Sequence, residues 1–119
     1  MNKKLPDNYV SEMAARVEES DQSITLFFNA VRKNNLQLVK KLLRNSPLLA
    51  LEVNDRMQTV LHVAVARKNL LKMVVFLLEL DCSSILLKSK DISGKTPLHL
   101  ATDLGDKEML QAIQNSGKL

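Results

Sequence analysis

The sequence predicts an all-α protein built from repeated pairs of short helices. The core must be mostly aliphatic, because the chain has 22 Leu but only three Phe, one Tyr and no Trp, and Leu-rich sequences favour helices. A six-residue segment also recurs, beginning at Thr25, Thr59 and Thr96, and apolar runs at helical spacing follow it. With 119 residues the chain has the length of one domain.

Charge and composition narrow the classes of partner. The net charge of +4 and the pI near 9.3 make the chain mildly basic, which favours an acidic partner surface. The scarcity of aromatic residues disfavours nucleic acid, since single-strand binders stack bases on aromatic rings.

No membrane association or export is expected. The longest uncharged stretches, 22–31 and 57–66, have about ten residues, whereas a membrane span needs about 20. The N-terminus lacks the apolar region of a signal peptide. Cys82 is the only cysteine, so an internal disulfide is impossible and a cytoplasmic or nuclear location fits best.

The first 22 residues are predicted to form an N-terminal arm with a capping helix over 7–19. Asp7 can cap this helix, and apolar residues follow at the spacing of an amphipathic helix: Val10, Met13, Ala14 and Val17. Such a helix would cover one apolar end of the repeat array.

The repeated segment is complete in its last copy, which reads Thr96-Pro97-Leu98-His99-Leu100-Ala101. The middle copy, Thr59-Val60-Leu61-His62-Val63-Ala64, starts 37 residues earlier, and the first, Thr25-Leu26-Phe27-Phe28-Asn29-Ala30, a further 34 residues earlier. Threonine can cap a helix, and proline at the first helical position lacks an N–H that would be unbonded there. Each copy therefore predicts a helix start.

This pattern resembles the ankyrin repeat, a unit of about 33 residues with the signature Thr-Pro-Leu-His-x-Ala. The resemblance implies an ankyrin-repeat solenoid of helix-turn-helix units over 23–119, with units at about 23–56, 57–93 and 94–119. It also implies that His62 and His99 form hydrogen bonds within the turns between repeats. The extra residues of the 37-residue period are placed near 66–69 and in 83–88, as loops. Polar residues of the last helix, Gln111, Gln114 and Asn115, predict a C-terminal cap.

Catalytic and cofactor chemistry is not indicated. The sequence has no HExxH or CxxC spacing for zinc, and Gly94, Gly105 and Gly117 are too scattered for a phosphate-binding loop. Ser83 and Ser84 lie beside Cys82 without a histidine near them in sequence. We therefore expect a non-catalytic protein without a cofactor, a bound metal or a small-molecule substrate.

Ankyrin proteins usually bind a protein partner on a concave face formed by the turn tips and by the ends of the first helices. Register places these candidates there: Arg32, Lys33, Arg56, Gln58, Arg67, Lys68, Ile92, Ser93, Lys95, Asp103 and Leu104. Six of them are positively charged, and this basic stripe suits an acidic partner. The alternative is that the charges only solvate the surface.

Two further functions stay open. The second period is loosely similar to repeats of inhibitor-of-kappa-B type regulators, which bind Rel/NF-kappa-B transcription factors, and small viral or bacterial mimics share that pattern. The chain could instead be a structural fragment of a longer array, although the initiating Met and the polar last helix favour a complete protein.

Overall fold

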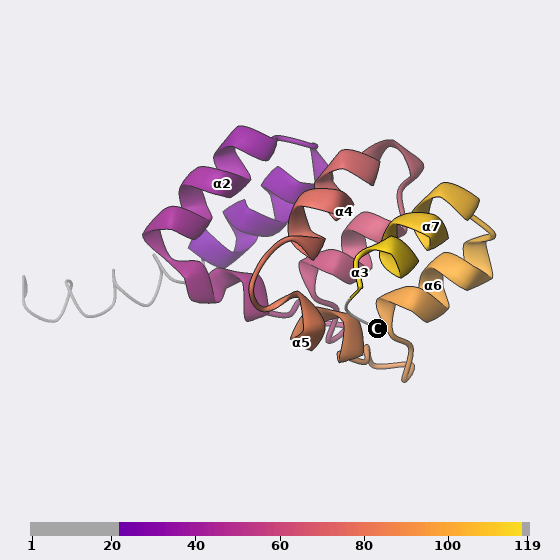
Figure 1. The fold of residues 1–119 in the computed structure, drawn as a ribbon. Coiled ribbons are helices and arrows are strands. Elements are labelled where there is room, and N and C mark those ends of the chain that lie inside the picture. The colour runs from indigo at the N-terminus through magenta and orange to yellow at the C-terminus, as the bar shows by residue number, and fades with distance from the viewer. Residues whose placement is uncertain (1–21, 118–119) are drawn as a thin grey trace, which may run out of the picture.

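The computed structural model describes residues 22–117, and within them every regular element is a helix (Figure 1). Three helix pairs follow one another along the chain, and we call them units 1, 2 and 3. The predicted all-α solenoid is confirmed. The predicted capping helix over 7–19 lies outside the described residues.

Each unit has a first and a second helix. The first helices are α1 (helical over 22–32), α3 (Val60–Val65) and α6 (Pro97–Leu104). The second helices are α2 (Leu36–Asn45), α4 (Leu71–Leu78) and α7 (Lys107–Asn115). Figure 1 shows α2, α4 and α7 side by side in one layer, with the first helices beneath them.

The core lies between the two layers and is richest in unit 2. All six residues of α3 are buried, because α3 packs against α4 within its own unit and against α6 of the next. The second helices contribute one apolar face each, from residues such as Val39, Met73 and Ile113, all at 0% exposure. Burying an aliphatic side chain of this size stabilises the fold by about 1.5–3 kcal/mol.

Two of the three repeated threonines, Thr59 and Thr96, cap their helices as predicted. The helix start predicted at Thr25 is wrong, because α1 is already helical at residue 22 and Thr25 lies inside it. The hydroxyl oxygen of Thr59 accepts a hydrogen bond from the backbone N–H of His62 at 3.4 Å, and that of Thr96 accepts one from His99 at 3.3 Å. Pro97 occupies the first turn of α6, and Gly105 ends that helix with a φ of 67°. These contacts satisfy N–H and C=O groups that helix ends would otherwise leave unbonded.

The segment 83–88 is a helix and not the predicted loop. Ser83–Lys88 forms α5, which packs against α4 and α6. Leu86 and Leu87 are buried at 0% and 4% exposure, so the helix contributes to the core. A shorter helical turn, η1 (Pro47–Leu51), follows α2 in the corresponding place of unit 1.

The other predicted insertion, near 66–69, is also partly helical, because η2 (Lys68–Leu70) leads directly into α4. None of the helices within residues 22–117 is long and apolar enough to cross a membrane.

Candidate functional site

The candidate surface begins with a turn between units 1 and 2, residues 54–58, which we call the first turn. The Asn54 side-chain oxygen accepts hydrogen bonds from the backbone N–H groups of Arg56 (2.9 Å) and Gln58 (3.0 Å). The Asn54 side-chain N–H group also donates to the Gln58 side-chain oxygen at 3.0 Å. One asparagine side chain thus fixes the backbone of the whole turn.

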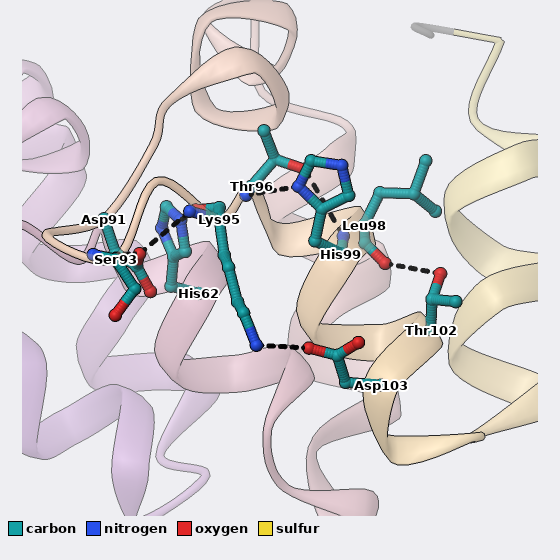
Figure 2. Close-up of polar contacts among 9 residues, drawn as sticks. All are labelled: His62, Asp91, Ser93, Lys95, Thr96, Leu98, His99, Thr102 and Asp103. Carbon is teal, nitrogen blue, oxygen red and sulfur yellow. Dashed lines mark hydrogen bonds and ion pairs between the residues drawn. The ribbon is translucent and has the colours of Figure 1, made fainter.

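Residues 91–95, the second turn, repeat this geometry between units 2 and 3 (Figure 2). An Asp91 carboxylate oxygen accepts from the backbone N–H groups of Ser93 (2.9 Å) and Lys95 (3.0 Å). The N–H of Lys95 is the main cause of a lowered pKa of the Asp91 carboxyl, helped by the N–H of Ser93 and by the charge of Lys95. The second turn is therefore organised by an ionised carboxylate.

A backbone hydrogen bond joins the two turns at their tips. The N–H of Ile92 donates to the carbonyl oxygen of Arg56 at 2.9 Å. The side chains at the two tips reach solvent: Arg56 and Ser93 are exposed, and Ile92 is 72% exposed. The tips combine a fixed backbone with free side chains.

His62 links unit 2 to the second turn. The buried ring accepts a hydrogen bond from the N–H of Thr59 at Nδ1 (3.1 Å), and its Nε2 lies 2.9 Å from the carbonyl oxygen of Lys95. A neutral ring with its hydrogen on Nε2 satisfies both contacts.

His99 is the corresponding residue of unit 3 and is exposed. Its Nδ1 accepts from the N–H of Thr96 at 3.1 Å (Figure 2). Both histidines therefore accept a hydrogen bond from the threonine that caps their own helix. The predicted contact with a turn between repeats is formed by His62, through the carbonyl oxygen of Lys95.

Lys95 and Asp103, two of the predicted binding residues, form an ion pair. The Lys95 Nζ atom lies 2.6 Å from a carboxylate oxygen of Asp103, and about half of each side chain is exposed. Asp103 raises the pKa of Lys95 by accepting this hydrogen bond and by its charge. Unit 3 thus neutralises its own cation at this surface.

The structure brings three other candidates, Arg32, Arg56 and Gln58, around one hollow between α1 and the first turn. We call it the first-turn hollow, and its other lining residues are Ile24, Thr25, Phe28, Val53, Asn54 and Asp55. The Arg32 guanidinium donates to the Asn29 side chain at 3.2 Å and lies over the Phe28 ring, 5.8 Å from its centroid. Arg32 is held in place before any partner arrives.

The repeated turns, the capping threonines and the stacked helix pairs agree with the sequence comparison. Residues 27–118 match the profile of ankyrin repeats in three copies. The chain belongs to the ankyrin-repeat family. No curated protein matches it. Ankyrin repeats are in general non-catalytic protein-interaction modules, so the two turns and the adjoining helix ends are the natural candidate surface.

The remaining predicted residues of the ankyrin array lie outside the first-turn hollow. Lys33 is exposed just after α1, and Leu104 is 54% exposed at the end of α6. Helix α3 ends at Val65, so Arg67 and Lys68 follow it in extended backbone and in η2. Phe28 and His62 occupy equivalent positions, and Lys33 and Arg67 each lie five residues after them, so these two cations are equivalent in units 1 and 2.

Sequence reasoning missed the residues that organise the ankyrin turns. Asn54 and Asp91 hold the two turns, and they are 37 residues apart, which is also the offset between the middle and last copies of the repeated segment. Short polar side chains of this kind commonly bond to the backbone of a turn. The shared offset is the signal that could have found them.

Two features of the described residues concern chemistry other than binding: the metal-ligating side chains and Cys82. Between residues 22 and 117 there is no group of three or more His, Cys, Asp and Glu residues that could hold a metal ion. Partial burial raises the pKa of the Cys82 thiol, with a smaller contribution from the charge of Asp81. A raised pKa lowers the thiolate fraction and so the reactivity of this cysteine.

Proposed function

We propose that this ankyrin-repeat protein binds a partner protein through a concave face made of the turn tips and the ends of the first helices. The observation that carries the proposal is the contrast within the two turns. Their backbones are fixed by Asn54, Asp91 and the bond between Ile92 and Arg56, while the side chains at the tips are exposed. A preordered backbone reduces the conformational entropy lost on binding.

The charge of this face supports an acidic partner surface. Lys33, Arg56, Arg67 and Lys68 are exposed, and among residues 22–117 the only ion pair is that of Lys95 with Asp103. These four cations therefore have no ion-pair partner within residues 22–117. Complementary charge mainly accelerates association, and exposed charges more than about 8–10 Å apart are screened at physiological salt.

The test begins with affinity capture of the protein's partners from cell extract and their identification by mass spectrometry. Association of the captured partner is then measured with the wild type and with Arg32, Lys33, Arg67 and Lys68 all replaced by Glu. We expect association to slow by about tenfold or more, and the wild-type rate to fall steeply with salt.

A matched control changes the same charge on the second helices. Lys41, Arg44, Lys72 and Lys107 are exposed on α2, α4 and α7, and replacing all four with Glu alters the net charge equally. Equal slowing by both quadruple variants would show an effect of net charge alone. Unchanged association in the first variant would remove the concave face from the binding surface.

The inhibitor-of-kappa-B-like role and a cytoplasmic or nuclear location stay predictions. A Rel-homology domain included among the tested partners addresses the first, and absence of binding to it would leave only the general interaction function.

A further inference from the structure

We propose that the first-turn hollow receives an acidic side chain, Asp or Glu, from an extended segment of the partner protein, with Arg32 and Arg56 as its two cationic contacts. This inference rests on the proposed function and names the chemistry that part of the surface recognises. Four observations lead to it: the origin of the hollow, its charge, the preordering of one arginine and its apolar walls.

The hollow lies where unit 1 lacks a bridge that unit 2 has. In unit 2 the ring of His62 reaches the carbonyl oxygen of Lys95, in the second turn, at 2.9 Å. Phe28 occupies the position of His62, and Gln58 occupies that of Lys95 in the first turn. A phenyl ring cannot donate this hydrogen bond, and both Phe28 and Gln58 line the hollow. The hollow is therefore bounded by the two positions of unit 1 whose equivalents in unit 2 form the bridge.

The charge of the hollow is also specific to unit 1. Arg32 lies four residues after Phe28, and Asp103 lies four residues after His99. Asp103 neutralises Lys95 in unit 3, whereas the corresponding residue of unit 1 is itself a cation. Within residues 22–117 neither Arg32 nor Arg56 has an ion pair, although Asp55 lines the same hollow. Two guanidinium groups and one carboxylate leave a net positive charge.

The two arginines differ in how firmly they are held. Arg32 is half-buried and restrained by Asn29 and the Phe28 ring, so it loses little side-chain freedom on binding. Arg56 is exposed at the turn tip, and only its backbone is fixed. The Arg56 side chain can therefore close over a carboxylate that Arg32 has already engaged. Guanidinium groups bind carboxylates through paired hydrogen bonds that lysine cannot reproduce.

The walls indicate what stands beside the carboxylate in the partner. Ile24, Phe28 and Val53 give the hollow an apolar side, and Val53 is 38% exposed. An apolar residue next to the acidic one would cover Val53 while the carboxylate meets the arginines. The predicted occupant is thus an acidic residue flanked by aliphatic ones.

The experiment uses a defined probe and the full chain. Protein labelled with ¹⁵N is titrated with the capped tripeptide acetyl-Leu-Glu-Leu-amide, and backbone amide shifts of the residues lining the hollow are followed. The same titration with acetyl-Leu-Gln-Leu-amide removes only the charge. We expect saturable shifts with the Glu peptide and at least about fivefold weaker binding of the Gln peptide.

Arg56→Gln is the test variant, because the Arg56 side chain is exposed and its loss leaves the turn backbone intact. Arg44→Gln is its matched control, an exposed arginine on α2 that does not line the hollow. The Glu peptide should bind the first variant at least about fivefold more weakly than wild type and should bind the second variant as it binds wild type.

Three results would overturn the inference. These are equal binding of the Glu and Gln peptides, unchanged binding to Arg56→Gln, or shifts that do not saturate. If a phosphoserine peptide of the same design binds more than about tenfold more tightly than the Glu peptide, the hollow recognises a phosphate group and not an acidic side chain, and the inference is also overturned. If binding of a captured partner is weakened by replacing Arg67 and Lys68 but not by Arg56→Gln, the proposed function is supported and the acidic-residue site in the hollow is contradicted.

Discussion

The Nε2 atom of His62 lies 2.9 Å from the carbonyl oxygen of Lys95, and this contact ties the buried centre of unit 2 to the turn that opens unit 3. The same ring holds the N–H of Thr59 through Nδ1. One side chain therefore supports both its own helix start and the boundary between two units.

Replacing His62 with Ala should lower the free energy of unfolding by about 2–3 kcal/mol. The change leaves the Thr59 N–H and the Lys95 carbonyl without their partner and opens a cavity at a fully buried site. Urea unfolding followed by circular dichroism gives the value. His99→Ala is the matched control, because His99 is exposed and bonds only to Thr96 within unit 3, and it should cost less than about 1 kcal/mol. Equal losses in the two variants would contradict the bridging role of His62.

Replacing Met57 with Gly should stabilise the protein by about 0.5–1 kcal/mol. Met57 has a φ of 62°, a backbone conformation that costs a side-chain-bearing residue energy, and the corresponding residue of the second turn is Gly94, with a φ of 81°. Met57 is 51% exposed, so removing its side chain costs the fold little packing. Thermal unfolding should show a higher Tm.

The reverse change tests the same cause. A Cβ added to Gly94 meets no atom within 4 Å, so Gly94→Ala should cost about 1 kcal/mol through backbone strain alone. A neutral effect at both positions would show that these turns relax without strain.

Asp91 should make stability depend on pH in the acid range. Its pKa is lowered in the folded protein, chiefly by the N–H of Lys95. The unfolded chain therefore binds the proton more readily, so the stabilisation is fully present above the ordinary pKa of about 3.9 and is lost as pH falls through the folded pKa.

The measurement compares wild type with Asp91→Asn in urea between pH 7 and pH 3. Asparagine fits the turn, since Asn54 has the same role in the first turn, but it does not ionise. The advantage of wild type over the variant should shrink as pH falls below about 4. A constant difference across this range would rule out the carboxylate as its source.

Helix α5 should contribute to stability through Leu86. This side chain is fully buried, so Leu86→Ala should cost about 2–4 kcal/mol in urea unfolding. Ile85→Ser, at a neighbouring residue that is 55% exposed, should change stability by less than about 0.5 kcal/mol. If Leu86→Ala were equally mild, α5 would be an appendage and not part of the core.

The signature residues predicted the helix starts because their chemistry is local. Thr59 and Thr96 bond to N–H groups three residues away, and Pro97 needs only the first turn of its own helix. These contacts do not depend on the rest of the fold, so the sequence specifies them directly. The loops predicted for the extra residues of the 37-residue period, near 66–69 and in 83–88, depend on tertiary packing, and the structure has helical segments there.

Helix α5 was missed because a six-residue helix shows too little periodicity to detect, and its two serines and lysine resemble a loop. Only burial of Leu86 and Leu87 against other helices explains it. The first-turn hollow depends on residues from α1 and from the first turn, about 25 residues further along the chain. Spacing alone did not indicate that Arg32 and Arg56 line the same hollow, or that Lys95 and Asp103 form a pair.

The burial of α3 separates two kinds of sequence change in this protein. All six of its residues are buried, the most exposed being Val63 at 8%, so a substitution there acts first on folding and offers a partner almost no new surface to contact. The tips at Arg56 and Ile92 have the opposite character, because their side chains bear almost none of the packing. If the partner binds at the tips as proposed, mutations there alter which partner is selected while the scaffold persists, so that recognition and folding can change largely independently.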